Sequence, residues 1–104
     1  MMKDMDKARI RVDFNELVQP NLVLLSQADL VIDSRGTEVP LTEGLPVSVY
    51  EYNDYADGEQ EYLLADGVVE PNDTALNGLW CEHVKWCCRI DERGIRIGDG
   101  SIWP

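Results

Sequence analysis

The sequence predicts an all-β protein of mainly antiparallel strands, folded as a small SH3-like barrel or a compact sandwich with at most one short helix. Short apolar runs alternate with polar residues at the period of two that is typical of half-buried strands. Turn-forming residues separate these runs, and no long helical pattern interrupts them. The 104 residues, 44% of them hydrophobic, suffice for a single domain spanning residues 1–104. We expect residues 1–6 and 99–104 to be frayed.

The first strand is predicted over residues 8–14, where the alternation is clearest. The apolar positions are Ala8, Ile10, Val12 and Phe14. Arg9 and its polar neighbours alternate with them, so we expect Arg9 on the solvent face. Residues 15–20 predict a connection, since Pro20 disfavours a long helix. Residues 21–25 predict a second strand.

Two turns share the pattern Ile-Asp-x-Arg-Gly, at residues 32–36 and 90–94. The Asp side chain can accept bonds from the turn backbone, and the Gly supplies a residue with positive φ. Each turn therefore predicts a tight hairpin. The first joins residues 30–32 to 38–41, and the second joins residues 80–90 to 95–97.

A third hairpin is predicted in the centre of the chain. Residues 47–52 contain β-branched and aromatic residues and predict a strand, residues 53–59 predict its turn, and residues 61–69 predict the returning strand. Asp66 and Gly67 predict a weakening or bulge in that strand. Residues 71–78 are predicted to be the longest and most mobile loop.

The charge is concentrated in one part of the chain. There are 20 acidic and 9 basic residues, giving a net charge of −11, and residues 36–84 contain no lysine or arginine. The rest of the chain is balanced, so the whole surplus lies in this central stretch. A solvated surface that keeps the protein soluble would explain it. An anionic face that steers a cationic protein partner would explain it too. Direct binding of nucleic acid is not expected, because the phosphate backbone would be repelled.

Candidate binding residues lie in the acidic turn of the central hairpin. They are Asp54, Asp57, Glu59 and Glu61. Together with the loop at residues 71–78 they form the expected contact surface for a partner.

Residues 80–88, Trp-Cys-Glu-His-Val-Lys-Trp-Cys-Cys, contain every cysteine and the single histidine. Alternation predicts a strand over residues 80–90 with Trp80, Trp86 and Cys88 on the core face. The opposite face then holds Cys81, His83 and Cys87. A helix over residues 76–93 is the alternative, because apolar residues also recur there at spacings of three and four.

No metal centre is expected from this cluster. Along a strand, Cys81 and Cys87 would lie about 20 Å apart, too far to share a zinc ion. Cys81 and His83 remain weak candidate ligands, and two further ligands would be needed. His83 would also lie too far from Cys87 for a catalytic pair. Cys87 stands between two cations, which would lower its thiol pKa, so it is a possible reactive thiol if solvent reaches it.

The remaining features indicate a reduced, cytoplasmic protein. An odd number of cysteines argues against a disulfide framework, and no apolar run is long enough to cross a membrane. The first residues lack the apolar segment of a secretion signal. No phosphate-binding loop or catalytic motif is present, so no cofactor is expected.

Residues 21–29 and 85–96 resemble stretches of small uncharacterised bacterial proteins. The resemblance implies a compact domain and carries no named activity or site residue.

Three functions remain open. The first is a non-enzymatic acidic module that binds another protein. The second is an immunity-type inhibitor that occupies the cationic site of a toxin such as a nuclease. The third is a small metal- or thiol-dependent protein that uses the cluster at residues 80–88.

Overall fold

The computed structural model describes residues 8–54, 58 and 60–98. The elements in chain order are β1 (Ile10–Arg11), η2 (Phe14–Glu16), β2 (Leu17–Gln19), β3 (Leu22–Ser26), β4 (Leu30–Ile32), β5 (Glu38–Pro40), β6 (Pro46–Asp54), β7 (Gln60–Pro71), α1 (Thr74–Asn77), η3 (Leu79–Cys81), β8 (Trp86–Ile90) and β9 (Arg96–Gly98). Here η marks a short 3-10 helix. The predicted all-β class is confirmed, and α1 is only four residues long. The segments predicted to fray, 1–6 and 99–104, lie outside the described residues.

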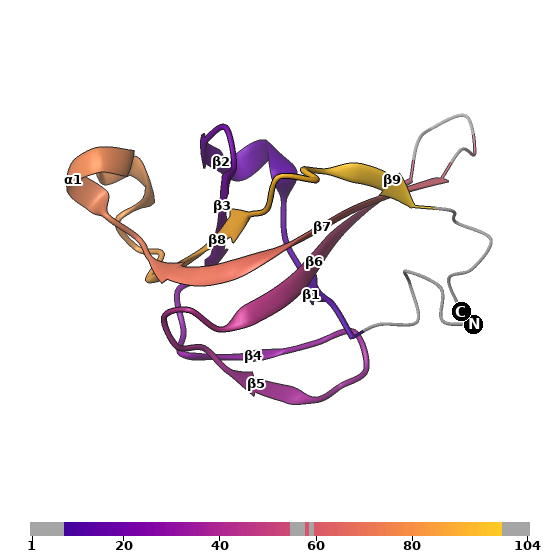
Figure 1. The fold of residues 1–104 in the computed structure, drawn as a ribbon, viewed down its shortest axis with the longest axis horizontal. Coiled ribbons are helices and arrows are strands. Elements are labelled where there is room, and N and C mark those ends of the chain that lie inside the picture. The colour runs from indigo at the N-terminus through magenta and orange to yellow at the C-terminus, as the bar shows by residue number, and fades with distance from the viewer. Residues whose placement is uncertain (1–7, 55–57, 59, 99–104) are drawn as a thin grey trace.

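The strands form one large sheet and one small one (Figure 1). The large sheet runs β1-β6-β7-β8-β3-β2, with β9 also paired to β7, and β4 pairs with β5 in the small sheet. Only the β1–β6 pair is parallel among these ladders. The two ends of the large sheet, β1 and β2, do not pair with each other. The fold is therefore a sandwich-like packing of two sheets, and the predicted barrel does not close.

The central hairpin, β6–β7, confirms the two predicted strands, while most of the predicted turn lies outside the described residues. Its register is continuous from Pro46, opposite Val68, to Asp54, opposite Gln60. The predicted bulge at Asp66 and Gly67 is therefore wrong. Gly67 is needed for a different reason: a Cβ there would lie 2.0 Å from the backbone oxygen of Arg89 on β8. The glycine allows β7 and β8 to approach closely.

Of the two predicted Asp-Gly hairpins, the first is confirmed and the second is wrong. In the first, Gly36 has φ 81°, and β4 pairs with β5 as expected. In the second, the turn forms, with Gly94 N donating to Asp91 O at 3.0 Å. However, β8 and β9 do not pair with each other. Because β7 is twelve residues long, both strands pair with the same edge of it at different positions. Strand β9 pairs with residues 62–64 and β8 with residues 67–71.

The main core lies between the two sheets. It contains Ile10, Val12, Phe14, Val23, Leu41, Val49, Ala65, Val69, Cys88 and Ile90. Val31 and Val39, from β4 and the neighbouring β5, pack against this core. Cys88 is thus a small buried apolar residue, as predicted. Two smaller clusters lie elsewhere: Leu22, Leu24, Cys81 and Cys87 form one, and Tyr62 with Leu64 forms the other.

The N-terminal strand matches its prediction in part. Ile10, Val12 and Phe14 are buried as expected, but Ala8 is exposed and Arg9 is 0% exposed. Strand β1 covers only Ile10–Arg11, so Arg9 lies before the strand and the alternation of faces does not decide where its side chain points. Its guanidinium donates to backbone oxygens of Val49 and Ala65 instead. The predicted connection at residues 15–20 contains β2, which pairs with β3.

Candidate functional site

The cysteine-rich segment is neither a continuous strand nor a continuous helix. Leu79–Cys81 forms η3, a turn follows, and the strand β8 begins only at Trp86. Both predictions for this region, a strand over residues 80–90 and a helix over residues 76–93, are therefore wrong for part of their length. Residues 80–85 therefore lie outside the sheet. Their side chains do not alternate between two faces as those of a strand would.

Two asparagines hold the α1–η3 segment in place. The Asn72 side-chain nitrogen donates to the backbone oxygens of Cys81 and Val84, both at 2.9 Å. The buried Asn77 donates to the side-chain oxygen of Asn72 at 2.8 Å and accepts from Gln19 of β2 at 3.0 Å. One of these bonds joins α1 to β2, and the others join η3, Val84 and α1 to Asn72, the residue after β7. The predicted loop over residues 71–78 contains one helical turn, α1, which these bonds hold in place.

Further contacts fix the backbone of this segment from within. Asp73 caps α1, since its Oδ1 accepts from the backbone nitrogens of Ala75 and Leu76. The Cys81 thiol, which is 0% exposed, lies 3.3 Å from the oxygen of Gly78. Gly78 has φ 104°, and a Cβ there would lie 3.0 Å from the Trp80 ring. The glycine therefore sets both the turn and the position of that ring.

The tied segment presents three large apolar side chains to solvent. Leu76 is 70% exposed, Leu79 75% and Trp80 60%. We call these three side chains the apolar knob. Figure 1 shows α1 at one end of the molecule. The prediction that Trp80 belongs to the core is wrong, because η3 turns it outwards. Adjacent exposed apolar side chains on a fixed backbone are typical of a protein-binding surface.

The surroundings of the apolar knob are acidic. Asp73 and Glu82, on either side of it in sequence, are both exposed. Lys85 is the first lysine or arginine after them, and its Nζ lies 2.7 Å from the Asp29 carboxylate. That carboxylate also accepts from the indole of Trp86, and both bonds lower the pKa of Asp29. The knob is thus flanked in sequence by two exposed acidic residues.

Two of the predicted acidic residues, Asp54 and Glu61, lie elsewhere, at the end of the central hairpin. Asp54 is exposed at the end of β6, and Glu61, half-exposed, pairs opposite Asn53. Asp57 and Glu59 lie outside the described residues. Asp54 and Glu61 are thus on neighbouring strands, as the hairpin predicts.

Cys87 does not meet the condition for a reactive thiol. It is 0% exposed and packs with Leu22, Leu24 and Cys81. Burial raises the pKa of Cys87 to about 11, with the nearby Cys81 and Glu70 adding to the rise and Arg89 opposing it. The predicted polar face was wrong because this face of β8 is covered by the α1–η3 segment. A protonated, covered thiol is a poor nucleophile.

The weak metal candidates, Cys81 and His83, point to different environments. Cys81 is buried in the small core cluster, whereas His83 is exposed in the turn. Cys81 and Cys87 belong to one cluster, so the 20 Å separation expected from a strand is also wrong. In the described part of the chain, no three His, Cys, Asp or Glu residues are grouped so that they could hold a metal ion.

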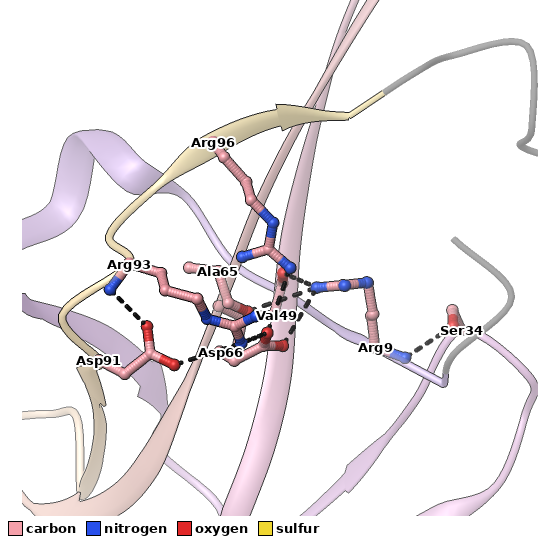
Figure 2. A network of polar contacts seen from close by, with 8 residues as sticks. All are labelled: Arg9, Ser34, Val49, Ala65, Asp66, Asp91, Arg93 and Arg96. Atoms are coloured by element: carbon pink, nitrogen blue, oxygen red, sulfur yellow. Dashed lines mark hydrogen bonds and ion pairs between the residues drawn. The ribbon is translucent and has the colours of Figure 1, made fainter. Parts of the chain in front are cut away.

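A second polar centre surrounds Asp66 in the middle of β7 (Figure 2). Its Oδ2 lies 2.6 Å from Arg93 and 3.2 Å from Arg96, and its Oδ1 lies 3.6 Å from the buried Arg9. Arg93 also approaches Asp91 at 3.4 Å. We call Asp66 and its three arginines the Asp66 cluster. The cluster joins β7 to two distant parts of the chain. Arg9 lies just before β1, and Arg93 and Arg96 follow β8.

A cleft of about 560 Å³ opens beside the Asp66 cluster. Its walls include Asp33, Asp66 and Asp91 with apolar residues of β5, β6 and β7. Each carboxylate already binds protein groups: Asp33 accepts from the backbone of its own turn, and the other two contact arginine. These carboxylates therefore serve the fold.

The apolar knob could not be identified from residue order alone. Leu76, Leu79 and Trp80 recur at spacings that suit a buried helix face as well as an exposed one. The signal that distinguishes the two is the short run between Asp73, a helix cap, and Gly78, a helix end. It limits α1 to a single turn, too short to bury one whole face.

No helix of the described residues is long enough to span a bilayer. No family model, curated protein or solved structure that was compared with the chain matches it.

Proposed function

We propose that this protein is a non-enzymatic interaction module that binds another protein through the apolar knob. The observation that carries the proposal is the exposure of Leu76, Leu79 and Trp80 on a segment held by Asn72 and Asn77. A partner that buries these side chains gains apolar contact without first ordering the segment. Little conformational entropy is lost on binding in such a case.

The partner is a protein with an apolar pocket and a basic rim. Asp73 and Glu82 flank the knob, and the chain as a whole carries a net charge of −11. Opposite charges around an apolar centre speed encounter and fix orientation, while the aromatic anchor supplies most of the affinity. The same charge supports the absence of direct nucleic-acid binding. The acidic turn with Asp54 and Glu61 would add to the steering.

Inhibition of a cationic toxin, such as a nuclease, is the more specific form of this function. It is favoured by the net charge of −11, because an anionic protein can occupy a site built for phosphate groups. It differs from the general proposal in one observable. The bound partner would lose its catalytic activity, in proportion to occupancy, when the module is added.

A reducing, cytoplasmic setting is part of the proposal. It is supported by three cysteines that are all free and all buried. Metal or thiol chemistry is not proposed, because Cys81 and Cys87 are buried whereas His83 is exposed.

The proposal is tested by affinity capture from a lysate of the source organism with matched baits. Wild-type protein, Trp80→Ala and Ile97→Ala are immobilised at equal density. Ile97 is 72% exposed but lies on β9, so it controls for general loss of apolar surface. We expect a protein that the wild type and Ile97→Ala retain and Trp80→Ala loses. Equal capture by all three baits would contradict binding through the knob.

A further inference from the structure

A chain of hydrogen bonds connects the α1–η3 segment to side chains on the large sheet. Nη1 of Arg89, on β8, donates to the side-chain oxygen of Gln19, on β2, at 3.1 Å. Gln19 donates to Asn77 at 3.0 Å, and Asn77 donates to Asn72 at 2.8 Å. Asn72 ends the chain with its two bonds to backbone oxygens of η3 and of the turn that follows it. We call Arg89, Gln19, Asn77 and Asn72 the amide relay.

All the bonds of the amide relay run in one direction. A guanidinium can only donate and a backbone oxygen can only accept, so the two ends of the relay fix the orientation of every amide between them. Each of the three amides accepts on its oxygen and donates from its nitrogen. Turning one amide around would place oxygen against oxygen or nitrogen against nitrogen. The relay therefore holds as a unit, and a fault at one end is felt at the other.

Arg89 is held firmly at the start of the relay. Its Nε and Nη2 donate to the two carboxylate oxygens of Glu70 on β7, at 3.1 and 2.6 Å, and this two-point contact fixes the plane of the guanidinium. Nη1 also donates to Asn21 at 2.9 Å. Among the described residues, Asn21 passes no bond on to the α1–η3 segment. Two amides thus share Arg89, and only Gln19 leads to the apolar knob.

The relay ends beside two buried thiols. Cys81 lies in η3 and Cys87 on β8, and both are 0% exposed and belong to the small core cluster. Cys88, the next residue along β8, belongs instead to the main core between the sheets. Movement of the α1–η3 segment away from β8 would expose the first two thiols and leave Cys88 covered. The three thiols therefore report the position of the segment.

We propose that Gln19 is the positioning residue of the apolar knob, which it ties through the amide relay to the Glu70–Arg89 ion pair. The α1–η3 segment stays closed over β8 while Gln19 links Arg89 to Asn77. When this link is lost, the segment opens and the knob loses its fixed backbone. A partner would then have to order the segment as it binds, at a cost in conformational entropy. This effect on a partner rests on the proposed function of the knob, whereas the effect on the segment does not.

Gln19→Glu is the test variant, because a carboxylate still accepts from Arg89 but cannot donate to Asn77. Asn21→Asp is the matched control. It makes the same change of an amide to an acid on the other amide that accepts from Arg89, and the same change in net charge. The two variants therefore differ in whether the altered side chain belongs to the relay.

Alkylation with iodoacetamide measures the opening of the segment, and tandem mass spectrometry locates the labelled thiols. We expect Gln19→Glu to label Cys81 and Cys87 at least about tenfold faster than the wild type, with Cys88 unchanged. Asn21→Asp should label them less than about twofold faster. Equal labelling of Cys81 in the two variants would overturn the proposal. Equal acceleration at all three thiols would overturn it too, since that result marks loss of the whole fold.

Failure of the relay and failure of the proposed function give different results. Trp80→Ala removes the aromatic side chain of the knob and no member of the relay, so its thiols should label at the wild-type rate. The labelling needs no partner, so it tests the relay even when no partner is captured. Where a partner is captured, Gln19→Glu should retain less of it than Asn21→Asp does.

Discussion

At the scale of single residues, the Asp66 carboxylate is the feature on which most charges converge. Its side chain is 12% exposed and lies among three arginines, of which Arg9 is fully buried. Removing one member of a buried ion pair leaves the other charge without compensation, a loss that exceeds the net value of the intact pair. Asp66 is therefore a structural residue of β7 and a sensitive one.

We expect Asp66→Asn to lower the free energy of unfolding by about 3–5 kcal/mol, because Arg9 keeps its charge and loses its anion. Urea unfolding followed by circular dichroism measures the change. Asp29→Asn serves as the control, since that carboxylate pairs with Lys85 on the surface and should matter little. Equal unfolding midpoints for Asp66→Asn and the wild type would show that the cluster contributes no stability.

The buried thiols predict how stability depends on pH. Burial raises the pKa of Cys87 from 9.0 to about 11 and that of Cys88 from 9.0 to about 12, so both thiols resist ionisation in the fold. The contribution of the two thiols to the free energy of unfolding is fully present below their pKa in the unfolded chain. It is lost as the pH rises through their pKa in the folded protein. We expect constant stability up to about pH 9 and a fall from there to about pH 12.

Urea midpoints measured between pH 7 and 11 check this prediction. The Cys87→Ala, Cys88→Ala double variant should show a shallower fall, because two of the titrating groups are gone. Tyr62, whose pKa is also raised by burial, would account for part of the remainder. A wild-type midpoint that stays level to pH 11 would contradict the burial of these thiols.

The burial of single polar residues was the least predictable part of the site. Arg9 stands in a clean alternation with Ile10 and Val12, which placed it on the solvent face. Its acceptors, Val49 and Ala65, are 40 and 56 residues away, so no local pattern reports them. Cys81 is similar, since its burial depends on the asparagine bonds that fold α1 and η3 over β8.

At the scale of elements, Gly67 controls how closely β7 and β8 can pair. We expect Gly67→Ala to cost roughly 3 kcal/mol or more, because the new Cβ would meet the backbone oxygen of Arg89 at 2.0 Å. Gly98→Ala is the matched control. There the Cβ would meet the end of the Leu64 side chain, which can move, so the loss should be smaller. Thermal unfolding compares the two, and equal losses would contradict this assignment.

Elements with local signals were predicted well, and elements set by distant partners were not. The β6–β7 hairpin and the Asp33–Gly36 turn follow from alternation and turn residues, and both formed as expected. The β8–β9 hairpin did not, because the length of β7 offers both strands the same edge. Residues 80–85 fit a strand pattern by composition, yet the side chains of Asn72 and Asn77 hold the chain in turns there.

At the scale of the whole molecule, charge and shape support one role. The all-β class followed from the sequence, whereas the exposure of the apolar knob required the fold. The net charge of −11 would attract a basic partner. Salt screens this attraction, with a screening length of about 10 Å at 0.1 M ionic strength. Apolar contact at the knob is insensitive to that screening. Association should therefore slow with added salt, while the contribution of Trp80 stays nearly constant.

The most direct test measures the affinity of the captured partner for three proteins, wild type, Trp80→Ala and Ile97→Ala, by isothermal titration calorimetry. We predict that Trp80→Ala binds at least about 30-fold more weakly, the loss of about 2 kcal/mol that is typical of a central aromatic anchor. Ile97→Ala should bind like the wild type. Wild-type affinity for Trp80→Ala, in a protein that is still folded, would contradict the role of the apolar knob.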